Sequence, residues 1–289
     1  MSRPVWLLTI IVIGCVLLSC SSEDDTEQQV VRISVLPDQE ETRLRKRFEP
    51  LIAYLSETLS MRVELFIPES YADQLQRFYN GEYDIARFGG FSFVKANEKT
   101  GAVPIVMRDI DTRFASYFLV GADNPASKIS DMKGQRFSFG SKSSTSGHLM
   151  PRYFLMKQNI ATEEYFSQVQ YSGAHDRTAY LVRDGKADLG VANAIVIDRL
   201  YKEGKLNKDQ VRILWKTPPY ADYVWAASAK LPKQLRLQIQ NAFMDLSKNV
   251  PEQAQILQAL EAGVYLPASP EDFASLKQIS HELRLLDDE

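Results

Sequence analysis

Short apolar strands alternate with amphipathic helices from residue 30 onward, and this order constrains the fold more than any other feature of the chain. Val30–Leu36 has the composition of a buried strand, and Thr42–Leu59 carries apolar residues at helical spacing. A strand at Val63–Ile67 and a helix at Tyr71–Asn80 repeat the order. Because parallel strands need long connections that are usually helical, the pattern predicts a mainly parallel sheet covered by helices, and hence an α/β fold.

The composition is that of an ordinary globular protein. Of the 289 residues, 45% are apolar and 25% are charged, which excludes disordered, collagen-like and disulfide-rich chains. The formal net charge is −3, so the chain has no basic excess with which to neutralise a phosphate backbone. We therefore expect no binding to nucleic acid.

The N-terminal residues have the features of a targeting segment. Val5–Leu18 is an almost unbroken apolar run of about 14 residues, which is short for a membrane span. Residues 17–20 (LLSC) resemble a bacterial lipobox, so we expect residues 1–19 to be a signal peptide and Cys20 to carry a lipid. The polar residues 20–29 would tether this anchor to the domain. An uncleaved signal anchor and secretion without a lipid are the alternatives.

Cysteine and histidine usage argues against a metal or cofactor site. Of the two cysteines, Cys15 would leave with the signal peptide and Cys20 would be lipidated, so the mature domain has no thiol. The three histidines are scattered and form no His-Glu-x-x-His pattern. We expect neither a metal nor a cofactor.

Two short apolar segments suggest that the chain passes twice between two lobes. Ser116–Gly121 and Tyr223–Ala227 lie roughly a hundred residues apart, and a second α/β set lies between them. The helices expected after Ala227 would return to the first lobe, at 235–248, 251–261 and 270–286. The predicted division is residues 30–115 and 224–289 for lobe 1 and residues 116–223 for lobe 2.

Four consecutive hydroxyl residues, Ser143–Ser146, follow the strand predicted at Arg136–Gly140 and precede an apolar helical run. A helix N-terminus offers unpaired N–H groups, and hydroxyls add donors without a counter-charge, so this pattern suits a small oxyanion. Gly147 would let the backbone approach closely, whereas Pro151 is expected to kink the helix. The alternative is a serine-rich loop with an ordinary N-cap. No Walker-type lysine follows the glycine, so an NTPase is not expected.

Two further helix starts and one loop could face the same crevice. Tyr71 follows a capping Ser70 and could donate its phenolic O–H, although a core tyrosine is the alternative. The segment Arg87–Ser92, which contains Gly90 and Phe91, begins another helix, although Gly89-Gly90 could equally be a tight strand-to-helix turn. His175 could donate to an oxyanion with its charge tuned near neutral pH, and Asp176 would cap the next helix. An exposed loop histidine is the alternative reading of His175.

These segments together resemble the phosphate, phosphite and phosphonate-binding components of bacterial ABC importers, a family of type 2 periplasmic binding proteins. The likeness covers about residues 30 to 285, and its motifs are individually weak but fairly specific in order and spacing. The matching segments are 144–147, 173–176, 184–191 with the following Asn193, 217–223, and 80–84 with Tyr71.

The resemblance implies two lobes that close on a ligand like a flytrap, joined by two hinge crossovers. It implies that the oxyanion is bound from the first lobe by Tyr71. From the second lobe it would be bound by Ser144, Thr145, Ser146 and His175. The predicted site comprises Tyr71, Gly90, Phe91, Ser144, Thr145, Ser146, Gly147, His175, Asn193 and Asp222.

Two departures from the family pattern bear on the ligand. The crevice turn 88–93 offers mainly phenylalanines where the family often has tyrosine. Residues 194–196 after Asn193 include no acid to pair with an ammonium group, which leaves Asp222 as the remaining candidate. Burying an ammonium group without a carboxylate is costly, so phosphite, phosphate or a small alkylphosphonate is expected rather than an aminophosphonate.

The leading hypothesis is a non-enzymatic, monomeric binding protein that serves an ABC permease in the periplasm or cell envelope, anchored by Cys20. The alternative is a periplasmic sensor for a membrane kinase or cyclase, which Ser21 favours because serine there directs enteric lipoproteins to the outer membrane. An enzyme is not expected, since Ser146 and His148 lie in no Gly-x-Ser-x-Gly elbow.

Overall fold

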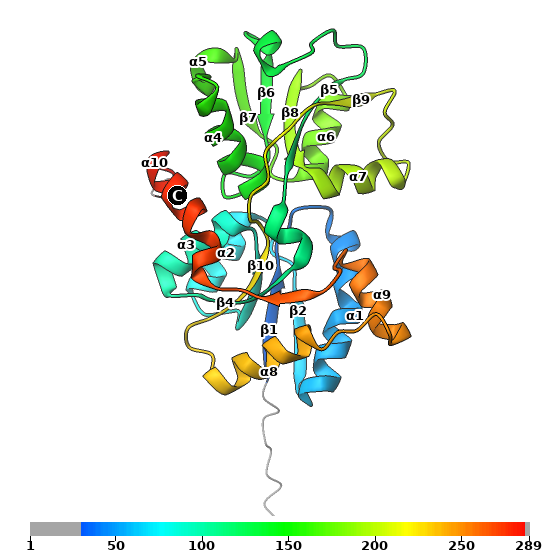
Figure 1. Ribbon diagram of the computed structural model, residues 1–289, viewed down its shortest axis with the longest axis vertical. Coiled ribbons are helices and arrows are strands. Elements are labelled where there is room, and N and C mark those ends of the chain that lie inside the picture. The colour runs from blue at the N-terminus through cyan, green and yellow to red at the C-terminus, as the bar shows by residue number, and fades with distance from the viewer. Residues whose placement is uncertain (1–29, 287–289) are drawn as a thin grey trace, which may run out of the picture.

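Two β-sheets, each covered by helices, form the two lobes of the computed structural model, which describes residues 30–286 (Figure 1). The predicted signal peptide, Cys20 and the tether lie outside the described residues. Within residues 30–286, no helix has the length and apolar character needed to cross a bilayer.

The first lobe has a six-stranded sheet in the order β11-β4-β10-β3-β1-β2. Phe48 and Leu51 of the first helix pack on Val31 and Ile33 of the first strand in its core. The strands are β1 (Val30–Val35), β2 (Arg62–Phe66), β3 (Ile85–Phe88), β4 (Val103–Arg108), β10 (Val224–Ala227) and β11 (Tyr265–Pro267). The helices are α1 (Glu41–Leu59), α2 (Tyr71–Tyr79), α3 (Gly90–Thr100), α8 (Lys233–Met244), α9 (Pro251–Ala259) and α10 (Ala274–Glu282), with the 3-10 turns η1 (Asp109–Arg113) and η4 (Pro270–Phe273).

The second lobe has a five-stranded sheet in the order β7-β6-β8-β5-β9. Its strands are β5 (Ser116–Gly121), β6 (Arg136–Phe139), β7 (Gln168–Tyr171), β8 (Leu189–Asn193) and β9 (Val211–Lys216). Its helices are α4 (Met150–Lys157), α5 (Thr162–Tyr165), α6 (His175–Arg183) and α7 (Ala194–Lys202), with the 3-10 turn η2 (Ile129–Met132) and the π-helical turn η3 (Thr145–Leu149).

The predicted α/β fold is confirmed, but the sheets are mixed rather than mainly parallel. β1 pairs in parallel with β2 and β3, whereas β10 is antiparallel to both β3 and β4. In the second lobe β5 is likewise antiparallel to β8 and β9. β5 and β10 enter their sheets directly from the other lobe. Neither strand has a covering helix in its connection, and the antiparallel direction needs none.

The two segments that connect the lobes run side by side. Phe114 and Tyr220 exchange two backbone hydrogen bonds, with N···O distances of 2.7 and 3.0 Å. The amide of Asp222 donates to the carbonyl of Asp111 at 3.0 Å, and the amide of Thr217 donates to Ser116 at 3.1 Å. The predicted pair of crossovers is therefore present and forms a short antiparallel ribbon.

The C-terminal part of the chain differs from the single helix expected at 270–286. It forms the turn η4 and then α10, which ends at Glu282. In Figure 1 α10 lies beside α3 of the first lobe and close to α4 of the second. Lys157 of α4 and Glu282 form an ion pair at 3.7 Å, so this helix contacts both lobes.

Candidate functional site

Five helices begin where the two lobes meet. Tyr71 opens α2 and Gly90 opens α3 in the first lobe, while Thr145 opens the π-helical turn and His175 opens α6 in the second. Asn193 precedes α7 as its N-cap. All five residues are buried, and all belong to the predicted site. Helix N-termini at the carboxyl ends of strands provide a set of N–H donors suited to an anion.

A wide turn positions the hydroxyl residues. The amides of Leu149 and Met150 donate to the carbonyls five residues earlier, at Ser144 and Thr145, which defines the π-helical turn. Pro151 has no N–H, so the carbonyl of Gly147 is left to accept from the amide of Gly140 at 2.8 Å. The expected kink is wrong, because Pro151 lies in the first turn of α4, where it is tolerated.

Gly147 allows the close approach that the sequence suggested. Its amide donates to Oγ of Ser144 at 2.9 Å. A Cβ at this position would lie 3.0 Å from Oγ of Ser144 and 3.1 Å from Cε1 of His175. A side chain here would therefore push the hydroxyl turn away from the imidazole.

His175 is a buried, neutral donor rather than an exposed histidine. Burial lowers its pKa, although Asp38 and Asp176 act in the opposite direction. The backbone amide of Asn193 donates to Nδ1 at 3.3 Å, which assigns the ring proton to Nε2. Nε2 lies 3.4 Å from the hydroxyl of Tyr71 across the junction. The expected tuning of its charge near neutral pH is therefore wrong, because burial keeps the ring neutral.

Asp176 does not cap α6 as expected. The N-cap of this helix is Ala174, which makes no side-chain capping bond. The carboxylate of Asp176 instead accepts from the amide of Glu40 in the other lobe at 3.2 Å. Asp176 therefore joins the lobes.

Tyr71 is a core residue and a polar one at the same time. Its side chain is 2% exposed, and burial raises its pKa well above the ordinary value, so the phenol keeps its proton. Its hydroxyl lies near His175 and also interacts with the hydroxyl of Ser144. It can donate from the first lobe to a ligand held by the second.

The start of α3 contacts the second lobe and the crossover directly. The amide of Phe91 donates to Oγ1 of Thr145 at 2.9 Å, and the hydroxyl of Ser92 donates to the carbonyl of Ser143 at 2.8 Å. The amide of Gly90 donates to Oδ1 of Asp222 at 3.0 Å. This turn, predicted as part of the site, holds the two lobes together.

Asp222 is a buried carboxyl group at the junction with one unpaired oxygen among the described residues. Burial raises its pKa to about 7, although the hydroxyls of Thr145 and Ser146 and the amide of Gly90 act to lower it. Its Oδ2 is buried and has no hydrogen-bond partner among the described residues. Buried polar atoms are rarely left unpaired, so this oxygen suits a donor on a ligand.

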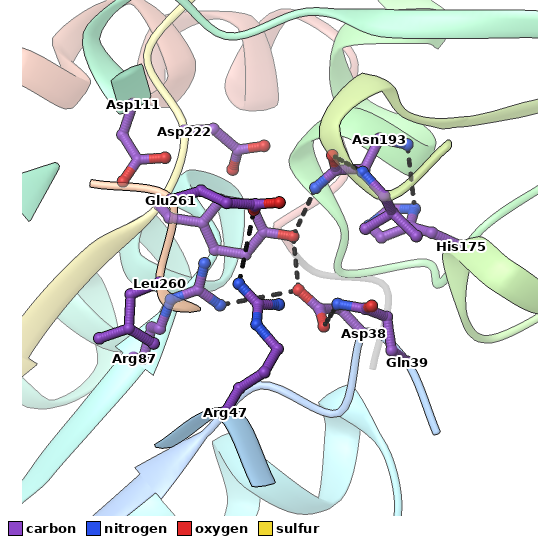
Figure 2. A network of polar contacts seen from close by, with 12 residues as sticks. Asp38, Gln39, Arg47, Arg87, Asp111, His175, Asn193, Asp222, Leu260 and Glu261 are labelled. Carbon is purple, nitrogen blue, oxygen red and sulfur yellow. Dashed lines mark hydrogen bonds and ion pairs between the residues drawn. The ribbon is translucent and has the colours of Figure 1, made fainter. Parts of the chain in front are cut away.

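A chain of polar contacts supports the site from the first lobe (Figure 2). The amide nitrogen of Asn193 donates to the hydroxyl of Tyr223 at 2.9 Å, and this hydroxyl donates to Asp38 at 2.7 Å. Arg87 pairs with Asp38 at 3.6 Å and stacks on Tyr223, 3.8 Å from the ring centroid. Asn193 thus uses its side chain within the protein, and its backbone orients His175.

Asp38 and Arg87 were not predicted as site residues. Burial alone would raise the pKa of Asp38, but Arg87 holds it below the ordinary value. The sequence did contain a signal, since Arg87 is a charge inside an otherwise apolar strand and Asp38 follows the end of another. Their pairing offsets the charge of Arg87, and the donors gathered at Tyr71, Ser144 and His175 are uncharged phenol, hydroxyl and imidazole groups.

The described part of the chain holds no group of three or more histidine, cysteine or acidic residues arranged to bind a metal. The arrangement suits binding of an anion through neutral donors.

Comparison with known proteins identifies the family. The family described as "ABC transporter, phosphonate, periplasmic substrate-binding protein" matches residues 33–273. This chain belongs to that family. Its members are substrate-binding proteins of transporters, as the sequence had suggested.

Curated relatives cover most of the chain. The probable ABC transporter phosphite binding protein PhnD1 of Prochlorococcus marinus is 30% identical over 275 residues, which are 91% of this chain and 93% of that protein. The phosphate-import protein PhnD of Mycolicibacterium smegmatis is 25% identical, over 75% of each chain.

Solved structures share the two-lobe fold. The structure of PhnD1 from Prochlorococcus marinus in complex with methylphosphonate is 29% identical and covers 89% of this chain and 98% of its own, with a TM-score of 0.85. The binding component of a phosphonate transporter from Pseudomonas aeruginosa is 19% identical, with a TM-score of 0.82 over 89% of this chain and 88% of that one. The type 2 periplasmic binding fold is therefore confirmed.

Proposed function

We propose that this binding protein captures phosphite, phosphate or a small alkylphosphonate between its lobes and delivers it to an ABC permease. The observation that carries the proposal is the set of uncharged donors around Thr145. The hydroxyl of Tyr71 contacts His175 and Ser144, the residue before Thr145, while the neighbouring cation Arg87 is paired with Asp38. Neutral donors can bind an oxyanion and still release it to a permease.

Asp222 supports a ligand that carries its own proton. A carboxyl group with a pKa of about 7 accepts a hydrogen bond from a P–OH group when it is ionised. Sulfate has no such proton near neutral pH and would face a buried carboxylate. We therefore expect the site to prefer monoprotonated phosphorus oxyanions over sulfate.

The same geometry disfavours an aminoalkyl group. Residues 194–196 at the start of α7 are Ala, Ile and Val, and the carboxylate of Asp38 is occupied by Arg87 and Tyr223. An ammonium group would have only Asp222, which the phosphorus oxyanion also needs. Aminoethylphosphonate is accordingly expected to bind less tightly than methylphosphonate.

The proposed lobes are residues 30–115 with 224–289, and residues 116–223. The paired crossover segments on either side of Phe114 and Tyr220 would act as the hinge, and closure would place both lobes on the ligand. The protein is proposed to act as a monomer without turnover of the ligand. Residues 1–19 are proposed as a signal peptide and Cys20 as the lipid anchor, with residues 20–29 as the tether.

Calorimetry on a variant that lacks one hydroxyl group of the site tests the proposed function. Thr145→Val keeps the shape of the side chain and deletes the hydroxyl, so the affinity for methylphosphonate, phosphite and phosphate should fall about tenfold or more. Thr100→Val is the matched control, because the hydroxyl of Thr100 donates only to the carbonyl of Ala96 within its own helix. Sulfate bound as tightly as the three phosphorus oxyanions, or equal losses in both variants, would contradict the proposal.

A further inference from the structure

His148 is a buried residue of the π-helical turn η3 and follows directly after the residues that carry the proposed donors. Its side chain is 3% exposed, and its ring packs edge-to-face with Phe139, with 4.8 Å between the ring centroids. Nδ1 lies 2.6 Å from the carbonyl oxygen of Lys142, six residues earlier in the chain. The side chain therefore reaches back to the point where the hydroxyl residues begin.

The neighbours of the ring decide which nitrogen carries the proton. Burial lowers the pKa of His148 to about 3, so the ring is neutral and has one donor and one acceptor. Nε of Arg152 lies 3.0 Å from Nε2, and a guanidinium group can only donate. Nε2 is therefore the acceptor, and Nδ1 holds the proton and donates to the carbonyl of Lys142.

Arg152 is itself held in place by contacts within the second lobe. Glu163 accepts from both of its terminal nitrogens, at 2.9 and 2.6 Å, and the hydroxyl of Tyr171 accepts from one of them at 3.1 Å. The guanidinium also lies over the ring of Phe139, 5.0 Å from its centroid. These contacts fix both the orientation and the tautomer of the imidazole of His148, as partners behind a functional histidine generally do.

The bond from His148 to Lys142 closes a loop around the hydroxyl residues. All of the segment Ser143–Ser146 lies between the two ends of this loop. The amide of Gly140 donates to the carbonyl of Gly147 at 2.8 Å and brings the two sides of the loop together. Because a peptide group is planar, fixing the carbonyl of Lys142 also fixes the peptide group with which the hydroxyl segment begins.

We propose that His148 is a positioning residue, which holds the segment Ser143–Ser146 in its ligand-binding geometry through the bond from Nδ1 to the carbonyl of Lys142. The proposal rests on the proposed function, because it assigns the segment its role as a donor set. Both ring nitrogens of His148 are used within the protein, so the residue does not contact the ligand. Donors that are already held in their binding directions lose less conformational freedom when a ligand binds, and this strengthens binding.

Nitrogen NMR on the full chain without ligand tests the geometry. Long-range nitrogen–proton spectra distinguish the two neutral tautomers of a histidine, and loss of the signals in His148→Asn assigns them to this residue. His148 should hold its proton on Nδ1, whereas His175 should hold its proton on Nε2. A proton on Nε2 of His148 would overturn the proposal, because the ring would then have no donor for the carbonyl of Lys142.

Calorimetry with two substitutions of His148 separates positioning from packing. His148→Phe keeps a ring against Phe139 but removes both nitrogens, so the Kd for methylphosphonate should rise about tenfold. His148→Asn loses the ring but keeps an N–H donor at the place of Nδ1, and it should recover most of this affinity. Its melting temperature should nevertheless fall, because the contact with Phe139 is lost.

A purely structural role predicts a different result for the same pair of variants. The Kd would then follow the melting temperature, and His148→Asn would not recover the affinity. If His148→Asn binds methylphosphonate as weakly as His148→Phe does, or if neither substitution changes the Kd, the proposal is wrong.

His281→Phe is the matched control, because it makes the same substitution at an exposed histidine of the first lobe. Nε2 of His281 contacts Glu98 at 3.1 Å, away from the hydroxyl segment. Its Kd should stay within about twofold of that of the unchanged chain. A rise equal to that of His148→Phe would count against positioning by His148.

The two experiments keep the positioning role and the proposed function apart. If the unchanged chain does not bind methylphosphonate, the proposed function fails, whereas the NMR measurement needs no ligand and still decides the contact between His148 and Lys142. If the unchanged chain binds methylphosphonate and the His148 variants bind it equally well, the positioning role alone fails.

Discussion

At the scale of single residues, Asp222 links the electrostatics of the site to its chemistry. It is buried, its pKa is raised to about 7, and one of its oxygens has no partner among the described residues. In the unfolded chain this carboxyl would have an ordinary pKa near 3.8. Between these two values the folded protein holds a proton that the unfolded chain has released, so folding becomes less favourable as the pH rises through this range.

Asp222→Asn should remove this pH dependence. Relative to the variant, the unchanged chain should lose about 2–3 kcal/mol of unfolding free energy between pH 5 and pH 8 in the absence of ligand. The comparison isolates Asp222 because the buried histidines are common to both proteins. Denaturant unfolding at several pH values measures the unfolding free energy of both proteins. If the two free energies change in parallel with pH, Asp222 has an ordinary pKa and the prediction is wrong.

Individual residues of the site could be predicted to different degrees. The hydroxyl segment, Tyr71 and His175 were found because each follows a strand or begins a helix in the local sequence. Asp38 and Arg87 were not found, because their role depends on a pairing between strands β1 and β3 some fifty residues apart. The neutrality of His175 depends on burial, which no local pattern reveals.

At the scale of elements, the local capping signal was correct for α2 and wrong for α6. Ser70 was expected to cap α2, and its hydroxyl does accept from the amide of Asp73 at 3.1 Å. Asp176 was expected to cap α6 but bonds to Glu40 across the junction. The antiparallel direction of β10 was not predicted either, because it depends on the crossover from the second lobe.

Ser70→Ala should destabilise α2 without removing any donor from the site. Loss of an N-cap of this kind costs about 1 kcal/mol of unfolding free energy. Chemical denaturation measures the loss, and Ser167→Ala, at an exposed position between α5 and β7, is the control. If both substitutions cost the same, Ser70 contributes nothing as a cap.

At the scale of the whole molecule, ionic contacts join the lobes outside the oxyanion site. Arg199 of α7 donates to Glu261 through two hydrogen bonds of 3.0 and 2.5 Å and to Gln39 at 2.7 Å. Glu261 and Gln39 both belong to the first lobe, and the partly buried guanidinium of Arg199 spans the junction. Figure 2 shows Glu261 and Gln39 beside the network around Asp38.

Arg199→Lys should weaken ligand binding, although we expect residue 199 to make no contact with the ligand. A lysine keeps the charge but cannot form the forked hydrogen bonds, so the contact between the lobes is weakened and the Kd for methylphosphonate should rise about three- to tenfold. Arg136→Lys is a matched control, because Arg136 makes the same kind of forked contact with Asp188 inside the second lobe. A similar change in Kd for both variants would contradict a role of Arg199 in closure.

The central claim is that neutral donors from both lobes bind a phosphorus oxyanion. A crystal structure of the full chain with methylphosphonate tests it most directly. The account predicts phosphonate oxygens within hydrogen-bonding distance of the hydroxyls of Tyr71, Thr145 and Ser146 and of Nε2 of His175, with Asp222 accepting from the P–OH group. A phosphonate bound by lysine or arginine side chains, or bound away from Thr145, would contradict it.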